Sequence, residues 1–443
     1  MGEERAYWNA IEKLPRTELE ELKLKRLRAI VRYAYYNSPF YHRWFEEAGV
    51  KPDDIRSFKD LERIPVFRKD DIRAERDKTG DPFAGLLCVP LDEVLLINPS
   101  TGTTGIPTFV TYAETELKIC AEMMCRHFWM TDARPGDKAL TIQLNWHWLG
   151  PPSITAYRRL GMHLLVDFVH PITAERYVWL AGFKPDFMFM DQPLLMAIRD
   201  EIREHTGKEP HELYGGVRNL VCAGESFPPK FKEHLMQEFG ITGGVYDLYG
   251  CSESHIVAVE CSEHNGNHFW EDMFHVEILD PDSGEVIPPD SGESGEVVVT
   301  NLFARDMPFI RYGTEDVAYL ETERCGCGRT HARLIPRDRI SWRIKISGKE
   351  IYPIDVRRIV EEFPETVEGA FTIRKYAEEM PKLKIDMRHE PWVRPEDEEA
   401  LARRICERIK EKLGVEAEIR WVSFSGLPVI FHKIERVLDE TKR

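Results

Sequence analysis

Residues 100–105 carry either a hydroxyl or no side chain, in the order Ser100-Thr101-Gly102-Thr103-Thr104-Gly105. A run of this kind offers closely spaced N–H and O–H donors with little bulk, which suits a polyphosphate. A Walker-type loop would continue through Gly-Lys-Ser/Thr into a helix, whereas Ile106 and Pro107 follow here. The run is therefore either a phosphate-binding loop of another type or a flexible Gly/Thr linker.

Four further segments fit nucleotide chemistry. The small-residue turn Gly224-Glu225 follows an apolar strand, at the strand end where α/β folds bind ligands. Tyr249-Gly250-Cys251-Ser252-Glu253 joins an aromatic face to a carboxylate, which could stack a base and hold Mg²⁺ through Glu253. Asp316 could accept both hydroxyls of a ribose, and Lys433 lies near the chain end. Singly each reads as a surface turn or solvated charge, and only their joint occurrence indicates a site.

The elements that must position these residues follow from periodicity. Apolar stripes predict a helix from residue 16 to Asn37 and another over 41–48. The loop at 100–105 is expected to join two strands, and helices alternate with strands over 91–302. Five apolar runs are predicted strands, the first three buried in an α/β sheet: 163–167, 187–190, 220–223, 276–279 and 295–300.

The C-terminal part has a pattern of its own. Residues 335–341 are polar and are predicted to be irregular. Beyond them a compact α+β pattern is predicted, with strands at 343–347, 367–373 and 416–423 and helices at 353–363 and 395–413. We therefore expect an α/β protein with a large N-terminal domain (1–336), a hinge (337–341) and a small C-terminal domain (342–443).

Bulk composition narrows the classes of function. The 443-residue chain, 42% hydrophobic and 31% charged, is typical of a soluble protein with two or three domains. A formal charge of −16 disfavours nucleic acid as a partner, and no stretch suits a membrane span or signal peptide. Nine cysteines without a secretion signal favour a reduced, cytoplasmic setting.

Taken in order, these motifs resemble the adenylate-forming (acyl-CoA synthetase) superfamily, and within it the phenylacetate–CoA ligase branch. The likeness extends nearly from end to end. Besides the phosphate loop it includes the segments 33–41, 247–250, 268–272, 308–312, 348–353 and 433–439.

The resemblance implies a large adenylation domain, a mobile C-terminal lid, and ATP, Mg²⁺ and coenzyme A as reactants. Lys433 would reach the acyl carboxylate and the α-phosphate, Glu253 would bind Mg²⁺, and Thr104 would act with the loop on the β- and γ-phosphates. After adenylation the lid would rotate and expose the adenylate to coenzyme A, with Gly348 leaving room for the pantetheine arm. The other implied nucleotide-binding residues are Ser100, Thr101, Gly102, Thr103, Gly105, Gly224, Glu225, Tyr249, Gly250, Ser252, Asp316 and, near the ribose, Arg337 or Arg339.

The chain departs from the pattern of this branch in several places. Gly313 and Ser347 each stand where an Arg is usual, and His432 replaces a Gly before the lysine. The largest departure is 143–149, where the phenylacetate enzymes carry a Tyr/Gly-rich segment lining the acyl pocket.

The segment 143–149 contains Trp146, His147 and Trp148. The two tryptophans would face one way on a strand, and their planes suit an aryl acid such as phenylacetate, a benzoate or a fused-ring acid. The alternative is that they belong to the core.

Cysteines offer a separate candidate site. Cys261, His264, Cys325 and Cys327 make four soft or borderline ligands, enough for a closed structural Zn²⁺ site. His268 or His331 could replace His264. The alternative is a set of reduced thiols at tight turns.

The leading prediction is an ATP-dependent aryl carboxylate–CoA ligase, monomeric or homodimeric, that releases AMP and pyrophosphate. A second is an adenylyltransferase like the synthetases that adenylylate a deazaflavin, which makes no thioester. A non-catalytic nucleotide-binding protein is disfavoured because Glu253, Asp316 and Lys433 are all present.

Overall fold

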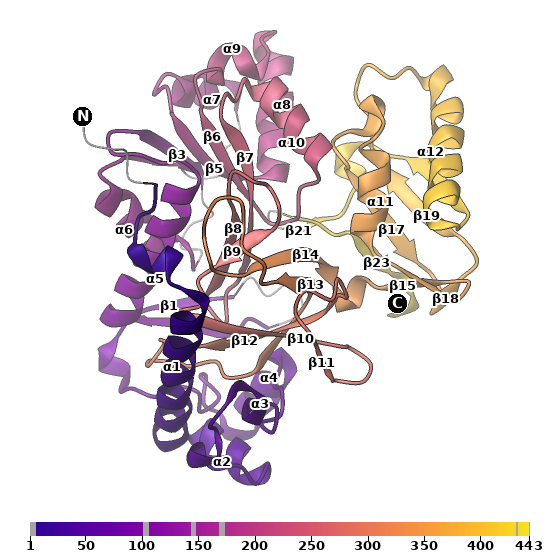
Figure 1. The fold of residues 1–443 in the computed structure, drawn as a ribbon. Coiled ribbons are helices and arrows are strands. Elements are labelled where there is room, and N and C mark those ends of the chain that lie inside the picture. Colours follow the sequence, from indigo (N-terminus) through magenta and orange to yellow (C-terminus); the bar gives the residue numbers. More distant parts are fainter. Residues whose placement is uncertain (1–5, 101–105, 143–147, 168–172, 431–432, 443) are drawn as a thin grey trace. The chain divides into compact units, whose positions relative to one another are not determined.

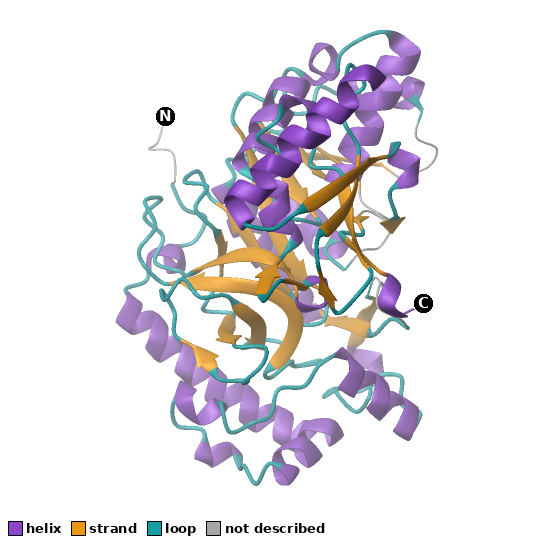
Figure 2. Ribbon diagram, turned by 90° about the vertical axis from the view of Figure 1, so that its right-hand side faces the viewer, coloured by secondary structure: helices purple, strands orange, loops and turns teal. Residues whose placement is uncertain are grey.

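The computed structural model describes residues 6–100, 106–142, 148–167, 173–430 and 433–442. The chain divides into two compact units, of which the first comprises 1–170, 186–188 and 248–336 and the second the remaining segments. Figures 1 and 2 show the helices and strands of each unit. No helix among the described residues combines the length and the apolar character that crossing a bilayer requires.

The first unit begins with four helices: α1 (Arg16–Asn37), α2 (Pro39–Glu47), α3 (Phe58–Leu61) and α4 (Lys69–Thr79). The break between α1 and α2 is local in origin, because Pro39 cannot continue a helix and the Ser38 side chain accepts a hydrogen bond from the Tyr41 N–H. The predicted helices over 16–37 and 41–48 are confirmed.

The phosphate-loop candidate connects two strands, as expected. Strands β1 (Val94–Pro99) and β2 (Phe109–Ala113) pair antiparallel, with Asn98 opposite Val110. Residues 101–105 lie outside the described part of the chain.

Two helices and two strands follow: α5 (Glu114–Met130), β3 (Lys138–Ile142), α6 (Gly150–Leu160) and β4 (His163–Asp167). Strands β3 and β4 pair in parallel. The prediction that 163–167 is buried is wrong, because in β4 only Asp167 is buried. Among the described strands β4 comes last in its sheet and pairs only with β3, so its side chains are less covered.

The remaining strands that lie wholly or partly in the first unit make up the largely antiparallel part of a sheet, in the order β11-β10-β12-β13-β14-β9-β8-β7. The first four residues of β7 and the last three of β14 belong to the second unit. Their bounds are β7 (Gly244–Cys251), β8 (Ile256–Glu260), β9 (Asn267–Phe269), β10 (Phe274–Leu279), β11 (Val286–Ile287), β12 (Gly295–Asn301), β13 (Tyr312–Glu321) and β14 (Arg333–Arg339).

Strand β14 corrects the prediction of an irregular stretch over 335–341. It continues to Arg339, and a 3-10 turn follows at Ile340–Trp342. Main-chain pairing with β9 begins at Arg333 and Leu334. Because ladder hydrogen bonds come from the backbone, a polar segment can continue a strand wherever the sheet offers a partner.

The second unit begins with alternating helices and buried strands. They are α7 (Ala174–Ala181), β5 (Phe187–Asp191, which begins in the first unit), α8 (Gln192–Thr206), α9 (Pro210–Tyr214), β6 (Asn219–Ala223) and α10 (Pro229–Phe239). The strands predicted at 187–190 and 220–223 are confirmed, and both are buried except at their last residue.

The C-terminal part of the second unit contains a four-stranded sheet with order β20-β19-β17-β23, a three-stranded sheet β16-β15-β18 and the pair β21-β22. Its helices are α11 (Pro353–Val360) and α12 (Glu398–Leu413). Its strands are β15 (Ile344–Ile346), β16 (Lys349–Ile351), β17 (Phe371–Lys375), β18 (Glu379–Met380), β19 (Leu383–Met387), β20 (Ala417–Trp421), β21 (Val429–Ile430), β22 (Lys433–Ile434) and β23 (Val437–Asp439). Ile373, Ile385 and Ile405 belong to one buried core here. The predicted α/β class and α+β C-terminal pattern are confirmed.

Candidate functional site

Glu253 is the centre of a buried polar chain in the first unit. It lies in the turn between β7 and β8, and its Oε1 accepts a hydrogen bond from Thr108 Oγ1 at 2.8 Å. Ser100 Oγ accepts a hydrogen bond from the Thr108 N–H and donates its own hydrogen to Thr108 Oγ1, each at 3.1 Å. The first residue of the phosphate-loop candidate is thereby connected to the predicted Mg²⁺ ligand.

Lys69 neutralises this carboxylate. Its Nζ lies 2.7 Å from Glu253 Oε1 at the start of α4, and both side chains are largely buried. Burial alone would raise the pKa of Glu253, but Lys69 and Thr108 more than offset it and hold the pKa at about 2. The carboxylate is therefore ionised at neutral pH, as a cation ligand must be.

Sequence reasoning missed both Lys69 and Thr108. Lys69 belongs to the charged run Arg68-Lys69-Asp70-Asp71, which resembles the solvated start of a helix. Only the fold brings this lysine to Glu253, and nothing in the local pattern distinguishes it.

The residues predicted for the base and the ribose lie together. Tyr249 in β7 and Asp316 in β13 are joined by a hydrogen bond of 3.1 Å from the phenol to Oδ2. Burial and the Asp316 carboxylate both raise the pKa of Tyr249, so the phenol stays protonated and donates. Gly250 lies beside Tyr249 on β7, and Ser252, directly after the strand, donates to Glu253 Oε2 at 3.1 Å.

Trp148 is the one member of the predicted acyl pocket that the structure describes. It is buried in the turn before α6 and does not lie on a strand. A Cβ atom on Gly250 would lie 3.3 Å from its Cζ2 atom, and its ring centre is 6.1 Å from that of His255. Trp148 therefore packs beside the Tyr249–Glu253 segment, while Trp146 and His147 lie outside the described residues.

Lys433 is placed by its backbone alone. It opens β22 and pairs antiparallel with Ile430 of β21. Its side chain and residues Thr101–Gly105, including Thr104, lie outside what is described.

The remaining predicted residues belong to the second unit. Gly224 has φ of 107°, a conformation that favours glycine, and Glu225 beside it is paired with two arginines described below. Arg337 forms an ion pair with Asp355 of α11, and Arg339 ends β14. Gly348 is exposed in the turn between β15 and β16 with φ of 74°.

A cysteine cluster forms a second candidate site, within the first unit. The ligand atoms of Cys261, His268, Cys325 and Cys327 all lie within 4.8 Å of one another. Cys261 Sγ is 3.6 Å from Cys325 Sγ, and Cys327 Sγ is 3.5 Å from His268 Nε2. Sulfur and imidazole donors at this spacing match a tetrahedral Cys₃His zinc site.

The histidine of this group is His268, one of the two predicted alternatives, rather than His264. His264 Nδ1 instead lies 3.2 Å from Glu260 Oε2. His331 has both nitrogens engaged with backbone, since Nδ1 accepts from the Glu271 N–H at 2.9 Å and Nε2 lies 3.0 Å from Ile11 O. His268 Nδ1 lies 3.0 Å from His331 O, which fixes the ring with Nε2 toward the thiols.

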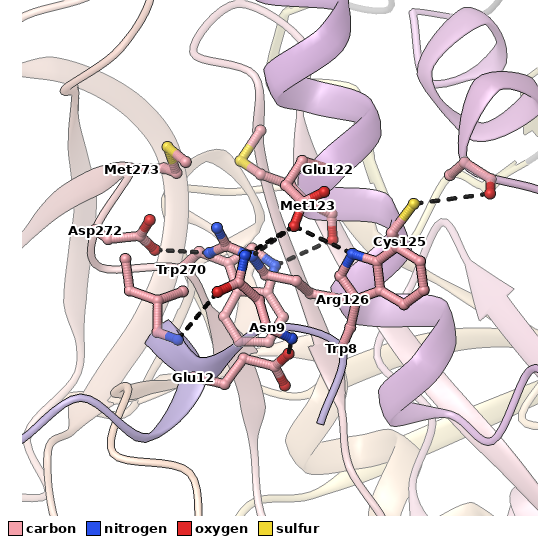
Figure 3. A network of polar contacts seen from close by, with 12 residues as sticks. Trp8, Asn9, Glu12, Glu122, Met123, Cys125, Arg126, Trp270, Asp272 and Met273 are labelled. Atoms are coloured by element: carbon pink, nitrogen blue, oxygen red, sulfur yellow. Dashed lines mark hydrogen bonds and ion pairs between the residues drawn. The ribbon is translucent and has the colours of Figure 1, made fainter. Parts of the chain in front are cut away.

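The N-terminal segment packs on the loop that carries two of these cysteines. Tyr7 donates to Cys327 O at 2.9 Å, and Glu12 pairs with Arg329. Figure 3 shows the adjoining network, in which Trp8 and Asn9 donate to Glu122. The loop that carries Cys325 and Cys327 therefore lies beneath a segment more than 300 residues away in sequence.

Arg126 connects that network to the segment that follows β9. It lies in α5, and Nη1 donates to Oδ1 of the buried Asp272 at 2.8 Å (Figure 3). Because Asp272 closely follows β9, which carries His268, helix α5, the N-terminal segment and the cluster form one connected region.

Comparison with known protein families gives two matches. Residues 45–302 match the family described as AMP-binding enzyme, and residues 348–441 match the AMP-binding enzyme C-terminal domain.

The chain is similar along its length to two curated proteins, both named phenylacetate-coenzyme A ligase. The protein of Thermus thermophilus is 32% identical over 98% of this chain and 100% of its own length. That of Aromatoleum evansii is 30% identical over 97% and 96%. A crystal structure of 2-hydroxyisobutyryl-CoA ligase in its postadenylation state superposes with a TM-score of 0.88, at 24% identity over 100% of this chain and 94% of that one.

Proposed function

Because the chain belongs to the AMP-binding enzyme family, we propose that it is an ATP-dependent aryl carboxylate–CoA ligase acting on phenylacetate or a related aryl acid. One observation supports this above the others: Tyr249–Asp316 and Ser100–Thr108–Glu253 lie on neighbouring elements of one unit, in a chain similar along its whole length to phenylacetate-coenzyme A ligases.

In the first half-reaction the acid's carboxylate attacks the α-phosphorus of ATP, and pyrophosphate leaves. Tyr249 would border the adenine and Asp316 would accept the ribose hydroxyls, which positions the α-phosphate. Thr101–Gly105 would bind the departing phosphates. Ionised Glu253 with the Thr108 hydroxyl is an oxygen donor set that fits Mg²⁺, whose charge would offset the repulsion between carboxylate and phosphate.

In the second half-reaction the thiol of coenzyme A attacks the acyl carbon and AMP leaves. Lys433 would serve only the first half-reaction, and Gly348 only the second. The proposed division places a hinge at 337–341 between an adenylation domain (1–336) and a lid (342–443). The second compact unit resumes at Arg337, where the proposed hinge begins, although it also contains residues 171–185 and 189–247 of the proposed adenylation domain.

For the cysteine cluster we propose a structural Zn²⁺ held by Cys261, His268, Cys325 and Cys327. The Cys261 thiol and the His268 imidazole lower the pKa of Cys327 against the effect of burial, which favours the thiolate that a metal requires. The site would keep the 325–331 loop in place beneath the N-terminal segment.

A panel of acids tests the function. Pyrophosphate release with phenylacetate, benzoates, fused-ring and aliphatic acids, each with and without coenzyme A, should be fastest with an aryl acid and accompanied by loss of free thiol. Pyrophosphate release without thiol consumption would favour the deazaflavin-type adenylyltransferase instead. The absence of pyrophosphate release with every acid would contradict both enzyme hypotheses.

A further inference from the structure

A buried ion cluster joins the turn after β6 to the C-terminal segment within the second unit. Glu225 Oε2 accepts hydrogen bonds from Nη1 of Arg357 at 2.8 Å and from Nε of Arg436 at 3.1 Å. Arg357 lies on α11, 132 positions after Glu225, and Arg436 lies between β22 and β23, 211 positions after it. All three side chains are at most 7% exposed.

Both arginines are fixed by further contacts. Arg357 donates to Glu361 at 2.6 Å and to Gln192 Oε1 at 3.1 Å. Arg436 donates from Nη1 to the carbonyls of Gly369 at 2.6 Å and Phe371 at 3.1 Å. The guanidinium groups are therefore oriented by their own segments, and Glu225 is the acceptor that they share.

The cluster lies close to the proposed catalytic lysine in sequence. Arg436 is three residues after Lys433, and the strand β22 carries both Lys433 and Ile434. Ile434 is buried against Met196, Ala370 and Leu427 in a core cluster of only four buried residues. An ion cluster and a small apolar contact thus hold the backbone on which Lys433 sits.

A contact made of ion pairs and a small apolar cluster suits a segment that must bind and be released repeatedly. Separated ionic groups recover hydration when a contact opens, whereas a large apolar face loses its burial without compensation. A single acceptor shared by two arginines also makes release cooperative, because loss of Glu225 leaves two buried cations facing each other.

We propose that Glu225 is the docking carboxylate for the Lys433 segment, with Arg357 and Arg436 as its positioning partners. The inference rests on the proposed function, since it assumes that Lys433 acts in adenylation and withdraws before thioester formation. It gives the Glu225 side chain a role in the conformational cycle in addition to its place at the proposed adenine turn.

The test separates the two half-reactions in Glu225→Gln, Arg436→Gln and the double variant, with Arg420→Gln as the control. Arg420 pairs with Asp386 inside the C-terminal sheet and is 61% exposed, so its loss leaves docking intact. We expect adenylation to fall by roughly tenfold or more in each docking variant, without further loss in the double variant. Thioester formation from supplied phenylacetyl-adenylate should stay within about twofold of the parent in each variant, and the KM for ATP should stay within about twofold in Arg436→Gln.

Partial rescue in Arg436→Lys, which keeps the charge, would support docking. Equal loss of both half-reactions, or a raised KM for ATP confined to Glu225→Gln, would overturn it in favour of folding or adenine binding. Trypsin cleavage at Arg337, Arg339 and Arg343 gives a readout without substrate and should speed up in Glu225→Gln and Arg436→Gln but not in Arg420→Gln. An unchanged rate of cleavage would refute docking whether or not the parent enzyme activates an aryl acid. A parent enzyme that activates no aryl acid would contradict only the proposed function.

Discussion

The Lys69 ammonium lies 2.7 Å from the Glu253 carboxylate, and the two groups come from a helix start and a strand turn 184 positions apart. In a largely buried setting such a pair is maintained only if each charge compensates the other. The carboxylate proposed for Mg²⁺ is thus already held in its ionised form by the fold. Lys69 and the cation would share one acceptor in the proposed first half-reaction.

The first prediction concerns Lys69→Met. Without the ammonium, burial dominates and the pKa of Glu253 rises above its ordinary value of 4.5, so the carboxyl becomes protonated in mildly acidic buffer. We expect adenylation to be reduced at pH 8 and to fall steeply between pH 8 and about 5.5, a loss that the parent does not show. Lys59→Met, which removes an exposed lysine paired with Glu62, should leave the pH profile unchanged.

We also expect Lys69→Met to have a lower thermal stability than the parent, by an amount that depends on pH. In the parent the depressed pKa of about 2 contributes stability that is fully present above about 4.5 and is lost as pH falls toward 2. In Lys69→Met the pKa of Glu253 lies above 4.5. The contribution of Glu253 to stability is then present below pH 4.5 and declines as pH rises past 4.5. The difference in Tm between parent and variant should therefore be larger at pH 8 than at pH 5, and a constant difference would contradict the assignment.

Lys433→Ala should abolish adenylate formation while leaving thioester formation from supplied acyl-adenylate largely intact. The reason is the proposed division of roles, in which the lysine acts only while carboxylate and α-phosphate meet. Pyrophosphate release and acyl-CoA formation from synthetic adenylate measure the two steps separately. Equal loss of both would remove Lys433 from its proposed role.

The zinc proposal predicts about one zinc per purified chain, measured by elemental analysis. His268→Ala and Cys325→Ser should lose the metal and lower the Tm more than they lower adenylation. His264→Ala is the matched control and should keep the metal, because His264 is directed toward Glu260. Metal-free parent protein with an unchanged Tm would instead favour reduced thiols, in line with the nine cysteines, none of which forms a disulfide.

Trp146→Ala and Trp148→Ala should change the ranking among aryl acids without greatly changing the KM for ATP. Trp148 is buried beside Gly250 and His255, close to the Glu253 turn where the acyl group would meet the nucleotide. Trp392→Ala, at an exposed tryptophan, is the control. A ranking fixed in both variants, or a preference for aliphatic acids in the parent, would place the pocket elsewhere.

The sequence by itself determined the family and most of the order of elements, and it named candidate nucleotide-binding residues that stay predictions. Such features are local: the hydroxyl and glycine loop, the apolar stripe of α1 and the Tyr249–Glu253 turn depend on neighbouring residues. Tertiary contacts changed predictions only where local pattern was a weak guide. Strand β4 has the composition of a buried strand but lies at an edge, and the polar residues up to Arg339 continue β14 because the sheet offers backbone partners.

Only the tertiary structure decided which distant charges and ligands meet. Lys69 in a charged helix start and Arg436 near the chain end resemble solvated residues in sequence, yet both are paired with buried carboxylates. His264 lies closer to Cys261 in sequence than His268 does, but the turn directs it to Glu260, and the backbone contact of His268 orients that ring toward the thiols. The physical reason is that charge pairing and metal geometry depend on separation in space, which chain spacing constrains only within a single element.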